Sequence, residues 1–218
     1  MKDFRLYAIT AEQFHPNRDL IEVMEEAIIG GADIIQLRDK ASGKEELLRK
    51  AQALRELTRK HGVTFIVNDH IDIALEADAD GIHLGQNDLP LEEARKLVGD
   101  KIIGISTHAI EEARLAEAQG ADYIGVGPVF RTATKADVVD PVSVSYVSEV
   151  AAEIRIPFVA IGGIKLSNVD EVIAAGAARI CAVSEIVGSD DVSGTCRAFL
   201  AKLGCKDKEE VTRNEAGH

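Results

Sequence analysis

The sequence predicts an α/β protein that folds as a single (β/α)8 TIM barrel. Short β-rich runs alternate with helical segments along almost the whole chain. The runs are continuous stretches of Ile and Val rather than polar–apolar alternations, which is typical of parallel strands covered by helices. Strand–helix units of roughly 27 residues recur eight times, and eight such units close a parallel sheet into a barrel.

Each predicted strand is a run of roughly five to eight mostly apolar residues, which is the usual length of a strand. From first to last, the strands cover residues 4–10, 33–38, 64–69, 81–85, 101–106, 123–130, 157–164 and 179–186. In a barrel, all eight lie side by side in one closed sheet with no free edge.

The predicted helices show apolar residues at three- and four-residue spacing, and several end in Gly. They cover residues 18–31, 44–62, 71–77, 89–99, 109–120, 144–154, 167–176 and 192–204. Residues 1–203 are therefore interpreted as the barrel domain. Residues 204–218 are polar without a strand pattern, and they are interpreted as a C-terminal tail.

An open doubly wound sheet is the main alternative fold. The barrel is favoured because the units recur evenly and no G-x-G-x-x-G follows the first strand, where a dinucleotide-binding fold would carry it. The repeated sequences "GGAD", "ADADG" and "QGAD" precede the second, fourth and sixth strands. This repetition suggests a duplicated module of two strand–helix units.

Composition excludes several classes of function. Hydrophobic residues make up 46% of the 218 residues, aromatics only 4%, and Trp is absent, so the core must be aliphatic. The net charge of −12 argues against a general nucleic-acid or anionic-membrane surface. No apolar run approaches the roughly 18 residues of a membrane span. A site for an anionic ligand would have to be built from a few local cations.

The cysteines indicate a reducing compartment. Cys181, Cys196 and Cys205 are odd in number and lack metal-ligand spacing, so they do not resemble a disulfide framework. The first residues, "MKDFRLYAIT", are a charged start that runs directly into a strand, unlike a signal peptide. The sequence therefore predicts a cytoplasmic protein. A homo-oligomer is compatible with such a barrel, but the sequence does not specify one.

Polar residues and glycines gather at the C-terminal ends of the predicted strands, where TIM barrels carry their chemistry. In chain order they are Gln36, Arg38, Lys40, Asn68, Asp69, His70, His83, Gln86, Asp88, Ser106, His108, Thr132, Thr134, Lys135, Gly162, Gly163, Val183 and Ser184.

Each of these residues also has a purely structural interpretation. Arg38 and Lys40 fit solvated loop charges, while Asp69 and Asp88 fit N-caps of the helices that follow them. His83 lies within an apolar strand, so a hydrogen-bonded core or supporting residue is favoured over a ligand. Because these strand ends converge on one face of the barrel, a shared binding site explains them together better than independent structural roles.

The residues that follow the last two predicted strands indicate a phosphate-binding site. Gly162 and Gly163 fit a tight turn, but they also allow backbone N–H groups to approach phosphate oxygens closely. Together with Val183 and Ser184, they follow the strands after which barrels commonly bind phosphate.

On the opposite side of the same barrel face, the residues at the strand ends indicate a site that binds a diphosphate with the help of a metal ion. Asp69 and Asp88 follow adjacent strands, and two carboxylates suit Mg²⁺, which also binds waters and substrate phosphate oxygens. Arg38, Lys40 and Lys135 supply cations for a multiply charged group, and no zinc-type Cys/His set is present. One phosphate pocket beside one diphosphate pocket suits an enzyme that joins two phosphorylated small-molecule substrates.

Several motifs of the sequence resemble those of a known family, the thiamine phosphate synthases. The resemblance is carried by "QLRDK", "VNDHIDIALEADADGIHLGQND", "GIS" with the following Thr and His, "YIGVGPVF" followed by Arg and "TATK", "VAIGGI" and "AVS". They appear in the family's order from Gln36 to Ser184. Any one of these motifs alone is weak evidence for the family, but the whole set is specific to it.

The resemblance implies a transferase that joins 4-amino-2-methyl-5-(diphosphooxymethyl)pyrimidine to 4-methyl-5-(2-phosphooxyethyl)thiazole, giving thiamine phosphate and pyrophosphate. The pyrimidine diphosphate would be held by Gln36, Arg38, Lys40, Asn68, Ser106 and Lys135, with Arg38, Lys40, Ser106 and Lys135 as the catalytic set. The thiazole phosphate would be held by Thr132, Thr134, Gly163, Val183 and Ser184. The cofactor Mg²⁺ would be held by Asp69 and Asp88.

The resemblance further implies that diphosphate leaves first, with Mg²⁺ assistance, before the thiazole nitrogen attacks. No conspicuous nucleophile–base pair is present, in agreement with such a mechanism. The chain departs from the family pattern at His70, where Arg is usual, at Asp39, where Glu is usual, and in segment 136–141, for which a closing loop is a hypothesis. A thiazole tautomerase on the same scaffold and a non-catalytic thiamine phosphate sensor are the alternatives.

Overall fold

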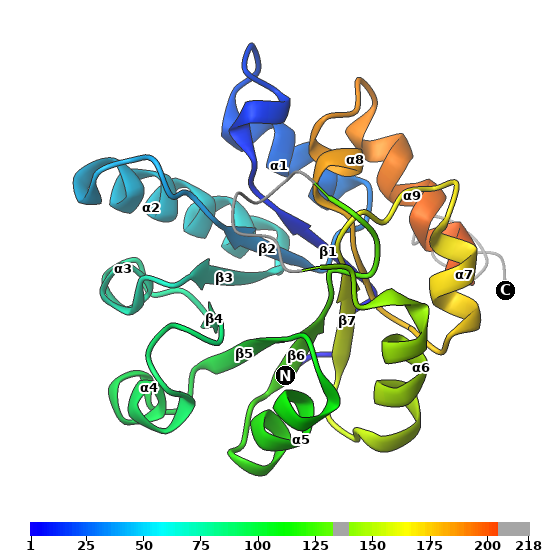
Figure 1. Ribbon diagram of the computed structural model, residues 1–218. Coiled ribbons are helices and arrows are strands. Elements are labelled where there is room, and N and C mark those ends of the chain that lie inside the picture. The colour runs from blue at the N-terminus through cyan, green and yellow to red at the C-terminus, as the bar shows by residue number, and fades with distance from the viewer. Residues whose placement is uncertain (133–139, 205–218) are drawn as a thin grey trace, which may run out of the picture.

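The structure is a closed barrel of eight parallel strands in sequence order, β1 to β8, surrounded by helices (Figure 1). It is a computed structural model that describes residues 1–132 and 140–204. Parallel pairing runs from each strand to the next, and β1 closes the barrel on β8 through the registers Leu6 with Ile180 and Tyr7 with Cys181. The predicted TIM barrel is confirmed, and the open sheet is excluded.

The strands lie where the sequence predicted them, although most are shorter. Their bounds are β1 (Leu6–Ile9), β2 (Ile34–Leu37), β3 (Thr64–Asn68), β4 (Gly81–Leu84), β5 (Ile102–Thr107), β6 (Tyr123–Val126), β7 (Phe158–Ile161) and β8 (Ile180–Cys181). The strand predicted at 123–130 ends at Val126, just before the cis Gly127–Pro128 peptide.

The predicted helices are also present. They are α1 (Leu20–Ile29), α2 (Lys44–His61), α3 (Ile71–Glu76), α4 (Leu91–Val98), α5 (Ile110–Ala118), α6 (Ser143–Glu153), α7 (Val169–Ala174) and α9 (Val192–Lys202). Two further elements were not predicted, a 3-10 turn η1 (Glu12–Phe14) and helix α8 (Val183–Val187). The prediction of a strand over 179–186 was therefore wrong beyond Cys181.

Two hydrophobic clusters fill the molecule, one on each side of the sheet. The larger lies between strands and helices and includes Ile35, Val67 and Ile103. The smaller contains Tyr7, Ile34, Ile66 and Tyr123, and it occupies the inside of the barrel because side chains alternate between the two faces of a strand. Burial on both faces explains why the strand sequences show no polar–apolar alternation.

The repeated aspartates have a structural role at the N-terminal end of the barrel. Each lies just before an even-numbered strand and accepts a hydrogen bond from a backbone N–H at the start of the preceding odd-numbered strand. The bonds are Leu6 N to Asp33 Oδ2 at 3.2 Å, Phe65 N to Asp80 Oδ2 at 2.8 Å and Ile103 N to Asp122 Oδ2 at 2.8 Å.

Two of these aspartates also bind an arginine from a helix. Arg55 of α2 lies 2.9 Å from Asp80, and Arg95 of α4 lies 2.7 Å from Asp122. The pattern thus repeats every two strand–helix units, as the sequence repeats suggested.

Among the described residues, no helix is both long and apolar enough to cross a membrane. Cys181 and Cys196 are buried thiols, and burial raises the pKa of Cys196 to about 12. Cys205 and the predicted tail from 205 onward lie outside the described residues.

Candidate active site

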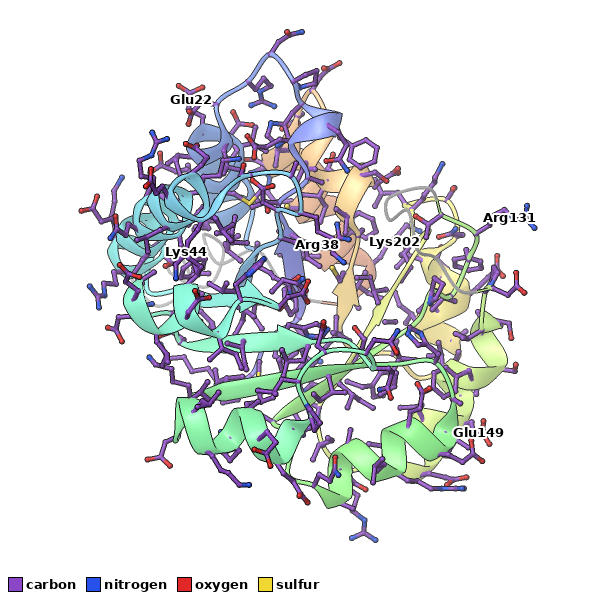
Figure 2. The ribbon with its side chains drawn as sticks, turned by 60° about the vertical axis from the view of Figure 1, so that its left-hand side comes forward. Glu22, Arg38, Lys44, Arg131, Glu149 and Lys202 are labelled. Atoms are coloured by element: carbon purple, nitrogen blue, oxygen red, sulfur yellow. The ribbon has the colours of Figure 1, made fainter. Side chains whose placement is uncertain are left out.

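A cavity of about 520 Å³ opens at the C-terminal ends of the strands. Figure 2 shows Arg38 directed toward the middle of the molecule, whereas Glu22, Arg131 and Glu149 project from its periphery. Of the predicted site residues, the cavity is lined by Arg38, Lys40, Asn68, Asp69, Asp88, Ser106, Thr132, Gly163, Val183 and Ser184. One cavity therefore collects residues from loops that are far apart in the sequence.

Among the predicted site residues that the structure describes, Gln36 alone does not line the cavity. Gln36 is 2% exposed and donates from Nε2 to the Tyr7 hydroxyl, at 2.8 Å, inside the barrel. Thr134 and Lys135 lie outside the described residues, as does most of the proposed closing loop at 136–141. Gln36 is thus placed beneath the cavity rather than in its wall.

His83 occupies a supporting position, as predicted. It is 9% exposed, and its two ring nitrogens lie 2.9 Å from the Tyr123 hydroxyl and 2.8 Å from the Ser106 hydroxyl. Ser106 lines the cavity, and its backbone carbonyl accepts a hydrogen bond from Gln86 Nε2 at 2.7 Å. His83 therefore holds a cavity residue from below.

The segment after β2 carries Arg38 and Lys40 on a braced backbone. The Thr10 hydroxyl accepts from the Arg38 N–H at 2.9 Å and donates to the Arg38 carbonyl at 3.1 Å. Asp39 accepts from the backbone N–H of Ala41 at 2.9 Å and of Ser42 at 3.0 Å. These bonds close a tight turn that leaves Arg38 and Lys40 at the cavity.

Lys50 of α2 locks this turn to the body of the barrel. Its ammonium lies 2.7 Å from Asp39 and also binds Glu12 of η1. Both members of the first pair are largely enclosed, with side-chain exposures of 16% for Lys50 and 9% for Asp39. Burial alone would raise the pKa of Asp39, but the Lys50, Ser42 and backbone donors outweigh it and hold that pKa well below 3.8.

Asp69 and Asp88 face the cavity instead of capping helices. The N-cap residues of α3 and α4 are His70 and Pro90, and neither helix has a side-chain cap hydrogen bond. Asp88 accepts from the Gly85 N–H at 2.6 Å, which fixes its carboxylate beside the β4 end. The backbone of Asp69 adopts φ 61°, a left-handed conformation that Asp tolerates better than most residues.

The two carboxylates form an acidic pair that suits a cation. Burial, followed by the negative charge of Asp88, raises the pKa of Asp69, while Lys40 and His70 act in the opposite direction. The Lys40 ammonium lies 3.9 Å from Asp69. Within the described residues, no set of three or more His, Cys, Asp and Glu side chains could hold a metal. Two hard carboxylates beside an open cavity fit Mg²⁺, which completes its shell with water and phosphate oxygens.

The glycine pair after β7 is required by close backbone packing. Gly162 and Gly163 have φ of 100° and 63°. A Cβ on Gly162 would lie 2.4 Å from Pro128 Cα, and one on Gly163 would lie 2.7 Å from the Arg131 carbonyl oxygen. The tight-turn interpretation is therefore correct, and the turn also forms part of the cavity wall.

Glu112 lines the cavity but was not predicted. It lies in the first turn of α5 and accepts from the His108 backbone N–H at 2.7 Å. In the sequence it looks like an ordinary acidic residue at a helix start, where negative charge is favourable. Nothing in the local pattern distinguishes it from the neighbouring Glu111.

Comparison with known proteins places this site in a family. The family model described as thiamine monophosphate synthase matches residues 6–186. The chain belongs to this family. The match includes all eight strands and the cavity residues described above, and it confirms the resemblance carried by the sequence motifs.

Relatives of the thiamine monophosphate synthase family match nearly the full chain. The thiamine-phosphate synthase of Halalkalibacterium halodurans is 68% identical over 204 residues, covering 93% of this chain and 97% of that protein. The thiamine-phosphate synthase of Shouchella clausii is 63% identical over 204 residues, covering 93% and 98%. The solved thiamine phosphate pyrophosphorylase from Pyrococcus furiosus has a TM-score of 0.84 at 36% identity, covering 92% of this chain and 96% of that one.

Proposed function

We propose that this chain is a thiamine-phosphate synthase. It joins the pyrimidine diphosphate to the thiazole phosphate, releasing pyrophosphate. The observation that carries the proposal is a single cavity in which the acidic pair, Arg38 and Lys40 lie across from the glycine turn of β7. Two differently charged subsites in one cavity fit two phosphorylated substrates that must meet. The proposed location of the enzyme is the cytoplasm.

The diphosphate of the pyrimidine substrate would lie beside Asp69 and Asp88. These two residues would hold Mg²⁺, which neutralises charge on the departing pyrophosphate when bound. Arg38 and Lys40 are held toward the same space by the braced turn after β2. Their positive charges stabilise the leaving group because charge develops there in the transition state.

The thiazole phosphate would lie on the other side of the cavity. Gly163 exposes backbone to the cavity because its position excludes a side chain. Val183 and Ser184 begin α8 beside it, and Thr132 follows β6 at the same wall. Backbone N–H groups and hydroxyls are suitable donors for a monophosphate.

Asn68 and Ser106 would hold the pyrimidine ring between these two subsites. The aminopyrimidine can stabilise the positive charge left when its C–O bond to diphosphate breaks, so no protein nucleophile is needed. The protein holds the thiazole nitrogen in line with the pyrimidine methylene carbon and excludes water that would trap it. The proposed contacts of Thr134 and Lys135 rest on the sequence motif alone.

A thiazole tautomerase and a non-catalytic sensor remain the competing functions to test. A tautomerase would have no need of the Asp69–Asp88 pair, and both carboxylates are retained beside the cavity. The relatives reported above are all named as synthases or pyrophosphorylases.

Asp88→Asn separates these functions. The amide can still accept from the Gly85 N–H, so the loop geometry is kept while one negative charge is lost. We expect kcat for thiamine phosphate formation to fall by about 100-fold or more, with Tm unchanged. The matched control is Asp100→Asn, at an exposed position after α4. Thiazole isomerisation that proceeds equally in both variants, without thiamine phosphate, would favour the tautomerase.

A further inference from the structure

Five side chains form a continuous hydrogen-bonded chain through the barrel interior. It starts on β2, crosses β1, β6 and β4, and ends on β5 at the cavity. The contacts are Gln36 Nε2 to Tyr7 Oη at 2.8 Å, Tyr7 Oη to Tyr123 Oη at 2.8 Å, Tyr123 Oη to His83 Nδ1 at 2.9 Å and His83 Nε2 to Ser106 Oγ at 2.8 Å. Each contact has the length of a good hydrogen bond.

Most of this chain is shielded from water. Gln36, Tyr7 and Tyr123 are 2%, 2% and 0% exposed, and His83 is 9% exposed. Of the five, Ser106 alone lines the cavity. The fold makes room for the chain, because a Cβ on Gly104 of β5 would lie 2.1 Å from Tyr123 Cζ.

In such a chain, every hydrogen bond must be donated in the same direction along the chain. A tyrosine hydroxyl has one proton to donate, and a neutral imidazole donates from one nitrogen and accepts at the other. Burial raises the pKa of Tyr7 and of Tyr123, so both hydroxyls keep their protons. The direction is therefore set at the end of the chain whose donor the structure assigns.

Gln36 provides that end. Its amide nitrogen only donates, so the Tyr7 hydroxyl accepts from Gln36 and donates to Tyr123. With this direction Tyr123 donates to His83 Nδ1, and a neutral His83 ring then carries its proton on Nε2. His83 Nε2–H donates to Ser106 Oγ, and the Ser106 proton is left for the cavity. The opposite amide orientation would reverse every one of these roles.

We propose that Gln36, Tyr7, Tyr123 and His83 form a hydrogen-bond chain of fixed direction that makes Ser106 a proton donor toward the cavity. Tyr7, Tyr123 and His83 are then positioning residues, because they act on the substrate only through Ser106. The substrate group that Ser106 meets must be a hydrogen-bond acceptor, such as a ring nitrogen or a diphosphate oxygen.

The assignment of a substrate acceptor to Ser106 rests on the proposed function, in which Ser106 holds the pyrimidine diphosphate. It also gives Gln36 a role beneath the cavity, as the residue that orients the chain. A site built to donate one hydrogen bond rejects an analogue that places a donor at the same point, because two donors would face each other.

The tautomer of His83 in the unsubstituted protein tests the direction of the hydrogen-bond chain. The measurement is a two-bond ¹H–¹⁵N correlation spectrum of the full chain labelled with ¹⁵N-histidine, at a pH above about 8, where ordinary histidines are neutral. The His83 signal is identified by its loss in His83→Gln. We expect protonated Nε2 and unprotonated Nδ1. Protonated Nδ1 would overturn the proposal.

Tyr123→Phe tests whether the chain sets this tautomer. The variant removes the donor to Nδ1, so we expect the His83 spectrum to lose its single Nε2–H form. The matched control is Tyr146→Phe, which removes another buried tyrosine hydroxyl, whose oxygen lies 2.8 Å from both Thr107 Oγ1 and the Ala109 carbonyl oxygen. An unchanged tautomer in Tyr123→Phe would also overturn the proposal.

Kinetics then test the link to the substrate. We expect Tyr123→Phe to raise the KM for the pyrimidine diphosphate by about five-fold, the effect of one weakened hydrogen bond, with the KM for the thiazole phosphate unchanged. Tyr146→Phe should leave both constants unchanged. Equal changes in both KM values would contradict a role through Ser106. The predicted tautomer in a protein that forms no thiamine phosphate would contradict the proposed function instead, and leave the hydrogen-bond chain standing.

Discussion

At the scale of single residues, Lys50 supports the site without lining its cavity. It joins the turn that carries Arg38 and Lys40 to η1 and α2 through Asp39 and Glu12. A buried carboxylate that loses its cationic partner is strongly destabilised. The position of two proposed catalytic cations therefore depends on a lysine that the sequence did not single out.

Lys50→Met is expected to lower both stability and turnover. Loss of the ammonium leaves Asp39 uncompensated, so the free energy of unfolding should fall by about 3 kcal/mol in urea titrations. The control is Lys96→Met, which removes a solvent-exposed pair with Glu93 and should change stability by less than about 1 kcal/mol. Equal losses of unfolding free energy in the two variants would show that the Lys50–Asp39 pair stabilises the protein no more than an exposed ion pair does.

The same pair predicts a dependence of stability on pH. The pKa of Asp39 is held below 3.8 in the folded protein, so its contribution is fully present above that unfolded value. The contribution is lost as pH falls from about 4 toward the folded pKa. The difference in unfolding free energy between the wild type and Asp39→Asn should therefore be constant from about pH 7 to 5 and shrink below about pH 4. A difference that grows on acidification would contradict this sign.

The depth of a site residue was not predictable from the sequence. Ile34, Gln36 and Arg38 follow one another at a spacing of two, so they point to the same side of β2 at successive levels. Arg38 reaches the cavity, whereas Gln36 ends below it. The short run "DIIQLR" gives no signal from which that level could be read.

At the scale of elements, the aspartates before β2, β4 and β6 fasten the N-terminal end of the barrel. We expect Asp122→Ala to lower the free energy of unfolding by about 2 kcal/mol, because the Ile103 N–H and Arg95 both lose their acceptor. Turnover per folded molecule should stay unchanged, since the active cavity lies at the opposite end of the strands. Asp100→Ala is the exposed control for the unfolding titration. Reduced kcat at full folding would contradict a purely structural role.

The identity and order of the strands and helices were predictable, but β8 was not predicted correctly. "RICAVSEI" is a short apolar run, and periodicity cannot separate a strand from a buried helical turn at this length. The chain leaves the sheet after Cys181, and Val183 begins α8. This change of element brings Val183 and Ser184 to the cavity wall, although the element predicted for them was wrong.

At the scale of the whole molecule, α9 covers the junction at which the barrel closes. Val192, Cys196 and Phe199 are fully buried, and Ser193 Oγ donates to the Glu26 carbonyl of α1 at 2.7 Å. Burial of Val192 and of Phe199 stabilises the folded state by about 1.5–3 kcal/mol each. Together these two contributions approach the total free energy of unfolding of a typical domain.

Truncation tests the predicted domain boundary. A chain ending at Gly204 should keep its turnover and its Tm to within about 2 °C, because the boundary leaves α9 intact. A chain ending at Asp191 loses α9 and should show no cooperative thermal transition. Circular dichroism melting curves of the two chains provide the comparison. Loss of folding on removal of residues 205–218 would place the boundary further toward the C-terminus than we propose.

The most direct measurement is turnover with both phosphorylated substrates and Mg²⁺, with thiamine phosphate and pyrophosphate quantified separately. We predict that the two products appear in equal amounts and only when both substrates are present. Chelation of Mg²⁺ should stop the reaction without lowering Tm. Isomerised thiazole phosphate without thiamine phosphate, or bound thiamine phosphate without turnover, would contradict the account.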